Sequence, residues 1–328
     1  MNRLLALPAL LAALAVALTG CAGGTPADDD APVDLSQVTL RVGDQAGIQS
    51  ALVEASGALD GAPYTVEWAQ FPAAAPLLEA LRSEAIDIGI AGDAPTLTAL
   101  SSTDSIKIVK ATRSPAKGGL ALLVPGDSPV QSVADLRGKT VSPTTQGSIG
   151  HYLLLRALEE AGVPAEEVEI SFLQPVDAAA ALNSGAIDAW STWDPYTAVA
   201  QQESGARILR DAEGLGTGLT FLDANTAALE DPGTRAAMAD FTERYATALQ
   251  WARENPAENA AIYSELTGRP AEVAELMADR AQRESEALDD DLVAELQGVA
   301  DRYADYGVLR SPVDVGSAVE DLAAPAGS

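Results

Sequence analysis

A segment that occurs twice at a fixed spacing is the strongest constraint on the fold of this chain. Residues 71–93 read FPAAAPLLEALRSEAIDIGIAGD, and residues 172–194 read FLQPVDAAAALNSGAIDAWSTWD. Each copy predicts a helix, a polar turn, a strand, and then an Asp and a Pro that begin another helix. Similarity at a fixed period is typical of repeated units and indicates two similar lobes. Generic strand–helix sequence in an Ala-rich chain is the alternative.

Short apolar or β-branched runs alternate with helical stretches in the first part of the chain. The predicted strands are Val38–Gly43, Tyr64–Trp68, Ile86–Ala91, Ile106–Ala111 and Leu120–Val124. Helices are predicted between them, for example over Ala73–Ser83 and Ala94–Leu100. This alternation predicts an α/β fold with mainly parallel strands. Ligands of such sheets bind beyond the carboxyl ends of strands, where the loops Gly43–Gly47 and Ala91–Pro95 are expected.

The later part of the chain predicts how the lobes connect. From Pro232 onward the sequence is nearly all helical, and its core candidates are Trp251, Ile262, Leu266, Leu276, Leu292, Leu296 and Tyr303. Connections between the lobes are expected near Leu123–Gly126 and near Gly218–Ala224, and the tail is expected to return to the first lobe. Residues 38–124 plus 223–328 then form lobe 1, and residues 125–222 form lobe 2. This is a hinged binding architecture with its cleft at the junction.

The N-terminus predicts export. Residues 1–20 read as a signal peptide, because the apolar run Leu4–Leu18 is too short to span a membrane. The run ends in Leu18–Cys21, which resembles the lipobox of bacterial lipoproteins and implies that Cys21 is lipidated. Cys21 is the only cysteine, so it cannot form an intramolecular disulfide. Residues 21–37 are predicted to be this lipidated N-terminus and a flexible tether. A leftover cysteine in an ordinary signal peptide is the alternative.

The charge of the chain excludes some classes of partner. The formal net charge is −28, and nucleic-acid binding depends on basic patches, so no nucleic-acid partner is expected. One histidine and one cysteine argue against a zinc or iron centre, so neither a metal nor a cofactor is predicted.

The stretch Lys139–Gly162 predicts a seat for an anion. A strand end, a polar turn and a helix follow one another, with Ser148 as the expected N-cap. Free backbone N–H groups and the positive helix end would meet at this point. His151, the only histidine, falls in the first helical turn, and we expect it on the rim of the seat. Binding should then take up a proton, and affinity should rise as pH falls from about 8 to about 5.5. An ordinary capped strand–turn–helix is the alternative.

Several motifs together resemble one family of receptors. They are Phe71-Pro72, Leu77–Leu81, Gly92–Pro95, Ser132–Lys139, Gly147-Ser148 with His151–Leu154, and Trp190 with Trp193–Tyr196. In this order they resemble the aliphatic sulfonate-binding proteins of ABC importers, in the wider group that includes taurine and nitrate receptors. The resemblance covers roughly Val38 to Asp231.

The resemblance implies both a fold and a site. The fold is α/β, two-lobed and periplasmic-binding-protein-like (type II), with two hinge connections and a helical C-terminal part. The implied ligand-binding residues are Gln45, Gly92, Asp93, Thr145, Gly147, Ser148, His151, Trp190, Trp193 and Asp194. The implied protein closes on a small anion and delivers it to ABC permease subunits. The ligand that the resemblance favours is an alkanesulfonate. It is expected to be a monomer, held by its lipid on the extracytoplasmic face of the membrane or located in the periplasm.

Two departures from the family pattern leave the ligand open. Relatives often carry an aromatic residue at the position of Asp44 and a basic or bulky residue at Ala46. The second hinge reads Phe221-Leu222-Asp223 where a Phe-Tyr pair is common. Taurine, nitrate or another oxoanion therefore stays an alternative ligand.

The site residues also have structural interpretations. Trp190 and Trp193 could be core residues, and Asp93 and Asp194 could be helix caps. No Lys or Arg lies in the proposed loops, so a sulfonate would be held by neutral donors and helix ends.

A binding protein is the leading functional class, with an enzyme on the same fold as its rival. No Ser/His/acid or Cys/His arrangement is evident in the sequence, which favours binding over catalysis. A scaffold protein would explain a lipid anchor but not the polar turns gathered at strand ends.

Overall fold

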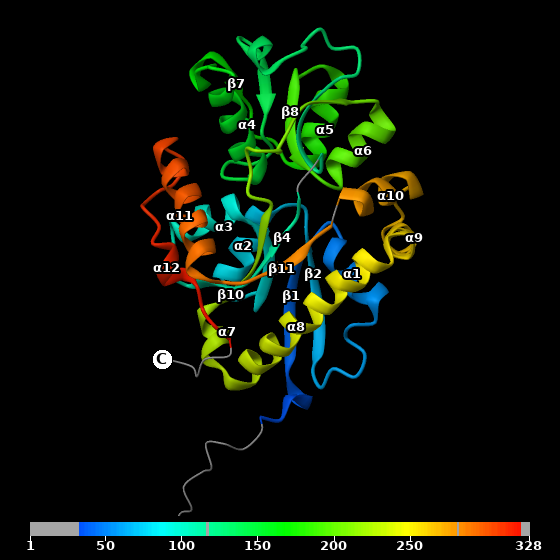
Figure 1. Cartoon of the computed structure of the whole chain (residues 1–328), viewed down its shortest axis with the longest axis vertical. Helices are drawn as coiled ribbons and strands as arrows, with labels where there is room; N and C mark the ends of the chain where they lie inside the picture. Colours follow the sequence, from blue (N-terminus) through cyan, green and yellow to red (C-terminus); the bar gives the residue numbers. More distant parts are fainter. Residues whose placement is uncertain (1–32, 116–117, 281, 323–328) are drawn as a thin grey trace, which may run out of the picture. The chain divides into compact units, whose positions relative to one another are not determined.

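Two β-sheets surrounded by helices make up the chain, as the computed structural model in Figure 1 shows. The structure describes residues 33–115, 118–280 and 282–322. The predicted signal peptide and the predicted lipidation site Cys21 lie outside these ranges. Within these ranges, no helix combines the length and the apolar character needed to cross a membrane.

The first sheet has six strands in the order β11-β4-β10-β3-β1-β2. They are β1 (Thr39–Gln45), β2 (Thr65–Phe71), β3 (Ile88–Gly92), β4 (Ile106–Arg113), β10 (Leu219–Asn225) and β11 (Glu284–Glu286). Strand β1 is parallel to both β2 and β3, whereas β10 is antiparallel to both β3 and β4.

The second sheet has five strands in the order β7-β6-β8-β5-β9. They are β5 (Leu120–Val124), β6 (Thr140–Ser142), β7 (Glu169–Ile170), β8 (Ala189–Trp193) and β9 (Arg207–Asp211). Strand β6 is parallel to β7 and β8, and β5 is antiparallel to β8 and β9. The order β2-β1-β3-β10-β4 thus recurs as β7-β6-β8-β5-β9, which confirms an α/β fold built from two similar units. The prediction of mainly parallel strands is wrong, because five of the nine strand pairings in the described residues are antiparallel.

The chain changes sheet at residues 114–119 and again at residues 212–218, which are called the first and second crossings below. Strand β5 pairs with β8 and β9, so it belongs to the second sheet, and all of β10 belongs to the first sheet. The predicted lobe ranges, 38–124 plus 223–328 and 125–222, count β5 with the first lobe and residues 219–222 of β10 with the second, which differs from this pairing. An apolar strand sequence does not show which sheet the strand joins, because pairing is a tertiary contact.

Helices follow the strands of both sheets. Those that precede the C-terminal part are α1 (Ile48–Ser56), α2 (Ala74–Arg82), α3 (Asp93–Leu100), α4 (Ile149–Glu160), α5 (Pro175–Ser184) and α6 (Tyr196–Ser204). The C-terminal part holds α7 (Thr226–Glu230), α8 (Pro232–Glu254), α9 (Pro256–Thr267), α10 (Ala271–Arg280), α11 (Asp290–Asp305) and α12 (Val315–Ala318). Short 3-10 helices span Leu35–Gln37, Val133–Leu136 and Ala165–Glu167.

The Ala-Ile-Asp motif performs the same task in both copies of the repeated segment. Asp87 accepts a hydrogen bond from the backbone N–H of Arg41 at 2.8 Å, and Asp188 accepts one from that of Thr140 at 2.9 Å. Each carboxylate also pairs with a basic side chain, Arg41 in the first copy and Lys139 in the second. The repeated aspartate therefore ties the strand that follows it to its parallel neighbour.

The C-terminal helices return to the first sheet, as predicted. Helix α8 packs Phe241 and Tyr245 into the cluster that holds Leu40 and Ile88 of that sheet. Strand β11 adds to the sheet edge beside β4. Leu292, Leu296 and Tyr303 of α11 are buried as predicted, whereas Leu266 is 46% exposed and is not a core residue.

Helix α10 joins parts of the chain that belong to different sheets. It packs on α9 and on α6, and one apolar cluster contains Ala51 of α1, Ala198 of α6, Tyr263 of α9 and Met277 of α10. The C-terminal part therefore contacts helices of both units beside the crossings.

Candidate functional site

A cavity of about 200 Å³ is lined by residues from both sheets, from both crossings and from the end of α10. Its lining includes the carboxyl ends of β1, β3 and β8, where the sequence places ligand loops. Six of the ten predicted binding residues line it, namely Gln45, Gly92, Asp93, Ser148, Trp193 and Asp194. The structure thus brings together loops that are far apart in the sequence.

The other four predicted residues lie elsewhere. Thr145 and Gly147 line a second cavity of about 470 Å³, which Ser148 also borders. Neither cavity is lined by His151 or Trp190. The start of α4, where the anion seat was predicted, therefore borders both cavities, because Ser148, Ile149 and Tyr152 line the first one and Ser148 also lines the second.

His151 is buried within the protein. Ser148 caps α4 as predicted, because its Oγ accepts a hydrogen bond from the backbone N–H of His151 at 3.1 Å. The Nδ1 of His151 accepts the N–H of Gly147 at 3.2 Å, and its ring contacts Phe172 and Tyr303. Burial lowers the pKa of His151 to about 4. A neutral ring packed in this way does not provide the proton uptake that the sequence analysis expected.

Trp190 is a core residue and Trp193 is a cavity residue. Trp190 is 1% exposed, and its Nε1 donates a hydrogen bond to Thr144 Oγ1 at 3.0 Å. Trp193 lines the cavity and is held edge-on against Tyr196. Successive side chains of a strand point to opposite faces, so residues three apart on β8 face opposite ways. The interpretation of Trp190 as a ligand contact is therefore not supported.

Asp44, which departs from the family pattern, caps a helix. Its carboxylate is fully buried and accepts hydrogen bonds from the N–H groups of Gln49 and Ser50, both at 3.0 Å. The hydroxyl of Ser50 and the amide of Gln70 also donate to it. The positive end of α1, which reaches the cavity, is thus already occupied by an internal carboxylate.

Asp93 is both a helix residue and part of the cavity wall. Its Oδ1 accepts the N–H of Ala94 at 2.7 Å, and its Oδ2 accepts the hydroxyl of Thr217 at 2.5 Å. Burial raises the pKa of Asp93, and the hydrogen bond from Thr217 opposes that rise. The bond also fastens the start of α3 to the second crossing.

Asp194 is paired with an arginine that the sequence analysis did not include. Its Oδ1 accepts the N–H of Ala198 at 3.0 Å, which caps the first turn of α6, and lies 3.2 Å from Arg280 Nη1. Burial raises the pKa of Asp194 to about 6, and the charge of Arg280 opposes the rise. Arg280 itself lines the cavity and donates a second hydrogen bond to Gln201.

A second arginine, Arg283, gives one side of the cavity a positive charge. It directly precedes β11, whose pairing with β4 places it beside the first sheet. In the part of the chain that the structure describes, its guanidinium forms no ion pair. It lies close enough to the Tyr245 hydroxyl to oppose the rise in that group's pKa that burial causes. An unpaired guanidinium in a cavity wall favours an anionic ligand.

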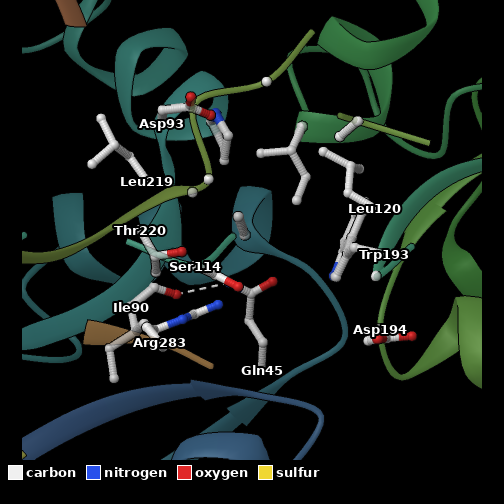
Figure 2. Close-up of a pocket in the computed structure, with 18 of the residues that line it drawn as sticks. Gln45, Ile90, Asp93, Ser114, Leu120, Trp193, Asp194, Leu219, Thr220 and Arg283 are labelled. Atoms are coloured by element: carbon white, nitrogen blue, oxygen red, sulfur yellow. Dashed lines mark hydrogen bonds between the residues drawn. The ribbon is translucent and has the colours of Figure 1, made fainter. Parts of the chain in front are cut away.

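Both sides of the cavity carry polar and apolar side chains, as Figure 2 shows, with Leu219 and Ile90 beside Arg283 and with Asp194 on the side of Trp193. Gln45 and Thr220 lie on the same side as Arg283, and the amide of Gln45 donates to the backbone oxygen of Ile90 at 2.7 Å. Trp193 and Leu120 face them from the other side. The arrangement suits a small molecule with one anionic end and one apolar end.

Arg280 and Arg283 are not among the binding residues predicted from the sequence. Both lie beyond Asp231, in the part of the chain where the sequence predicts helices but shows none of the motifs of the family. A basic residue next to a short extended segment, Glu284–Glu286, was the one available signal, and it does not show that this segment pairs with β4.

The comparisons with known proteins agree with this geometry. The model of the NMT1/THI5-like family matches residues 66–259 of this chain. An aliphatic sulfonates-binding protein of Escherichia coli (strain K12) is 32% identical over 286 residues, which are 85% of this chain and 88% of that protein. A protein of the same description from Bacillus subtilis (strain 168) is 26% identical, with 95% of this chain and 93% of that protein covered.

Solved structures show the fold class. The alkanesulfonate-binding protein SsuA from Xanthomonas axonopodis pv. citri, bound to MOPS, matches with a TM-score of 0.80 and 28% identity, covering 86% of this chain and 98% of that one. The desulfurization enzyme DSZB shares the fold alone, at 18% identity and a TM-score of 0.62, over 86% of this chain and 96% of that one. The architecture is therefore that of the periplasmic binding proteins. Within that class, the chain belongs to the NMT1/THI5-like family. Two of its relatives are described as aliphatic sulfonates-binding proteins. A third, from Escherichia coli (strain K12), is described as a taurine-binding periplasmic protein and is 34% identical over 152 residues, which are 46% of each chain.

Proposed function

We propose that the chain is the substrate-binding protein of an ABC importer and that it binds a small organic anion in the cavity of about 200 Å³. Among such anions, an alkanesulfonate fits the cavity best. The observation that carries the proposal is Arg283, an arginine without an ion pair among the described residues, opposite a wall that includes Trp193 and Leu120. The guanidinium would bind the sulfonate, and the indole and leucine side chains would cover the alkyl part. The names of the relatives support the same ligand class.

The apolar side chains in the cavity wall favour an alkanesulfonate over inorganic anions such as nitrate and sulfate. Nitrate or sulfate would use Arg283 but would leave Trp193, Leu120 and Leu219 without a ligand group to bury. Burial of each methylene group of an alkyl chain contributes about 0.8 kcal/mol. An alkanesulfonate should therefore bind more tightly than either inorganic ion.

An enzyme is the rival function, since a desulfurization enzyme shares the fold. The cavity is lined by two serines, Ser114 and Ser148. The hydroxyl of Ser148 donates to the backbone oxygen of Pro143, and Ser114 donates to that of Arg280. In the described residues neither serine is hydrogen-bonded to an imidazole nitrogen, so the cavity supports binding without turnover.

Titration calorimetry tests the ligand class. The chain carrying Cys21→Ser, which cannot be lipidated, would be titrated with ethanesulfonate, nitrate and sulfate. We expect ethanesulfonate to bind most tightly and Arg283→Met to weaken it by about tenfold or more, the scale of one charge-assisted hydrogen bond.

Arg137→Met is the matched control, because Arg137 pairs with Glu167 on the surface and does not line the cavity. Unchanged affinity in Arg283→Met, or tighter binding of sulfate than of ethanesulfonate, would refute the proposal. Conversion of the sulfonate during incubation would favour the enzyme.

The N-terminus supports a proposal about location. We propose that residues 1–20 are removed, that Cys21 is lipidated and that the monomeric protein works at the extracytoplasmic face of the membrane. Membrane fractionation of the wild type and of Cys21→Ser tests this, and continued membrane attachment of the variant would contradict it. Ethanesulfonate affinity should be equal in the two proteins, since Cys21 is not among the residues proposed to contact the ligand.

A further inference from the structure

The cavity contains a carboxylate opposite Arg283. Figure 2 shows Asp194 on the side of the cavity that faces Arg283. Its Oδ1 is used by Ala198 and Arg280, but among the described residues its Oδ2 has no hydrogen-bond donor. A Cβ on Gly119 would lie 3.0 Å from this oxygen, so the glycine leaves it accessible at the cavity wall. A ligand whose sulfonate binds Arg283 would direct its other end toward this carboxylate.

Arg280 decides what this carboxylate can bind. Its side chain is 11% exposed, with Nη1 on Asp194 and Nη2 on Gln201, and the packing of α10 against α6 holds it in place. Alone, Asp194 would attract a ligand ammonium group. With the guanidinium 3.2 Å away, the pair is nearly neutral, and an ammonium group would lie beside a fixed like charge in a partly buried site.

We propose that Arg280 is a specificity-determining residue, which neutralises Asp194 and so excludes sulfonates that carry an ammonium group while admitting those with an uncharged chain. This inference rests on the proposed function of the cavity and adds the ligand subclass. Arg280 acts here on the second end of the ligand, and Arg283 acts on the sulfonate.

The test compares two probes that differ only in the amine, ethanesulfonate and 2-aminoethanesulfonate. Calorimetry at pH about 7.5 would measure both in the Cys21→Ser chain, in which Asp194 is ionised. We expect ethanesulfonate to bind about tenfold or more tightly than the amine in this chain. Arg280→Met should reduce that ratio by about tenfold or more, and Arg280→Lys, which keeps the charge, should preserve it.

Asp194 variants provide a second, independent readout. Adding Asp194→Asn to Arg280→Met should remove the gain in amine binding. Asp194→Asn alone leaves Arg280 uncompensated and should raise the preference for ethanesulfonate by about threefold or more. This variant also keeps the test decisive if Arg280→Met fails to fold. The control is again Arg137→Met, which removes a surface arginine and should leave the ratio unchanged.

The possible outcomes separate the two proposals. An unchanged ratio in Arg280→Met or in Asp194→Asn would overturn the role of Arg280 while ethanesulfonate binding still supports the site. An equal loss of affinity for both ligands in Arg280→Met would also overturn it, because Arg280 would then contact the sulfonate group that the two ligands have in common. A wild-type cavity that binds neither sulfonate would overturn the proposed function and this inference with it.

Discussion

Asp223 should make the stability of the first sheet depend on pH. It lies on β10 and is fully buried, with Oδ2 accepting the hydroxyl of Thr96 at 2.6 Å and Oδ1 without a partner among the described residues. Burial raises the pKa of Asp223 to about 8, and the hydrogen bond from Thr96 opposes the rise only in part. The carboxyl group is therefore protonated in the native protein at neutral pH.

The sign and size of the effect follow from linkage. The ordinary pKa of this group is 3.8, so between about pH 4 and pH 8 the native state holds a proton that the unfolded state has released. The stability contributed by Asp223 is thus complete below about pH 4 and is lost as pH rises through about 8. The loss is about 1.4 kcal/mol per pH unit, and about 2 kcal/mol between pH 6 and pH 8.

Urea unfolding followed by circular dichroism at pH 6 and pH 8 measures this loss. Asp223→Asn cannot ionise, so its free energy of unfolding should fall by about 2 kcal/mol less than that of the wild type over the same interval. Asp127→Asn, at an exposed turn, is the control that removes a charge without removing a buried proton site. Equal pH dependence in the wild type and in Asp223→Asn would refute the reasoning.

Four further predictions concern the buried His151, the pH dependence of affinity, a helix cap and salt. Burial lowers the pKa of His151 to about 4, so its contribution to stability should be lost as pH falls from about 6.5 to about 4. The free energy of unfolding in urea should fall by about 3 kcal/mol over this interval, and it should fall less in His151→Gln. Ethanesulfonate affinity measured by calorimetry should stay flat from pH about 8 to about 6.5, and a rise there would place His151 in the site. Asp44→Asn should lower stability by about 1–3 kcal/mol in thermal unfolding, because α1 loses a charged cap, and an unchanged midpoint would contradict the cap. Sulfonate affinity should change less than about threefold between about 20 mM and about 200 mM salt, because contacts inside the cavity are poorly screened; a steep loss in calorimetry would indicate binding at the surface.

The sequence by itself determined the repeated architecture. The segments 71–93 and 172–194 predicted two similar units, and both sheets have the same strand order. The Ser148 cap was also predictable from the sequence, because a cap depends on residues within one helical turn. Strand alternation could have separated Trp190 from Trp193, since positions an odd number apart face opposite sides of a strand.

The tertiary structure decided which side chains share the cavity. Arg280 and Arg283 reach it because β11 pairs with β4 and α10 packs on α6, contacts between residues far apart in the chain. It also decided that β5 joins the second sheet and that His151 is packed in the interior. Local sequence patterns fix helices, strands and caps within a few residues, whereas the charge and shape of a cavity depend on which distant segments pack together.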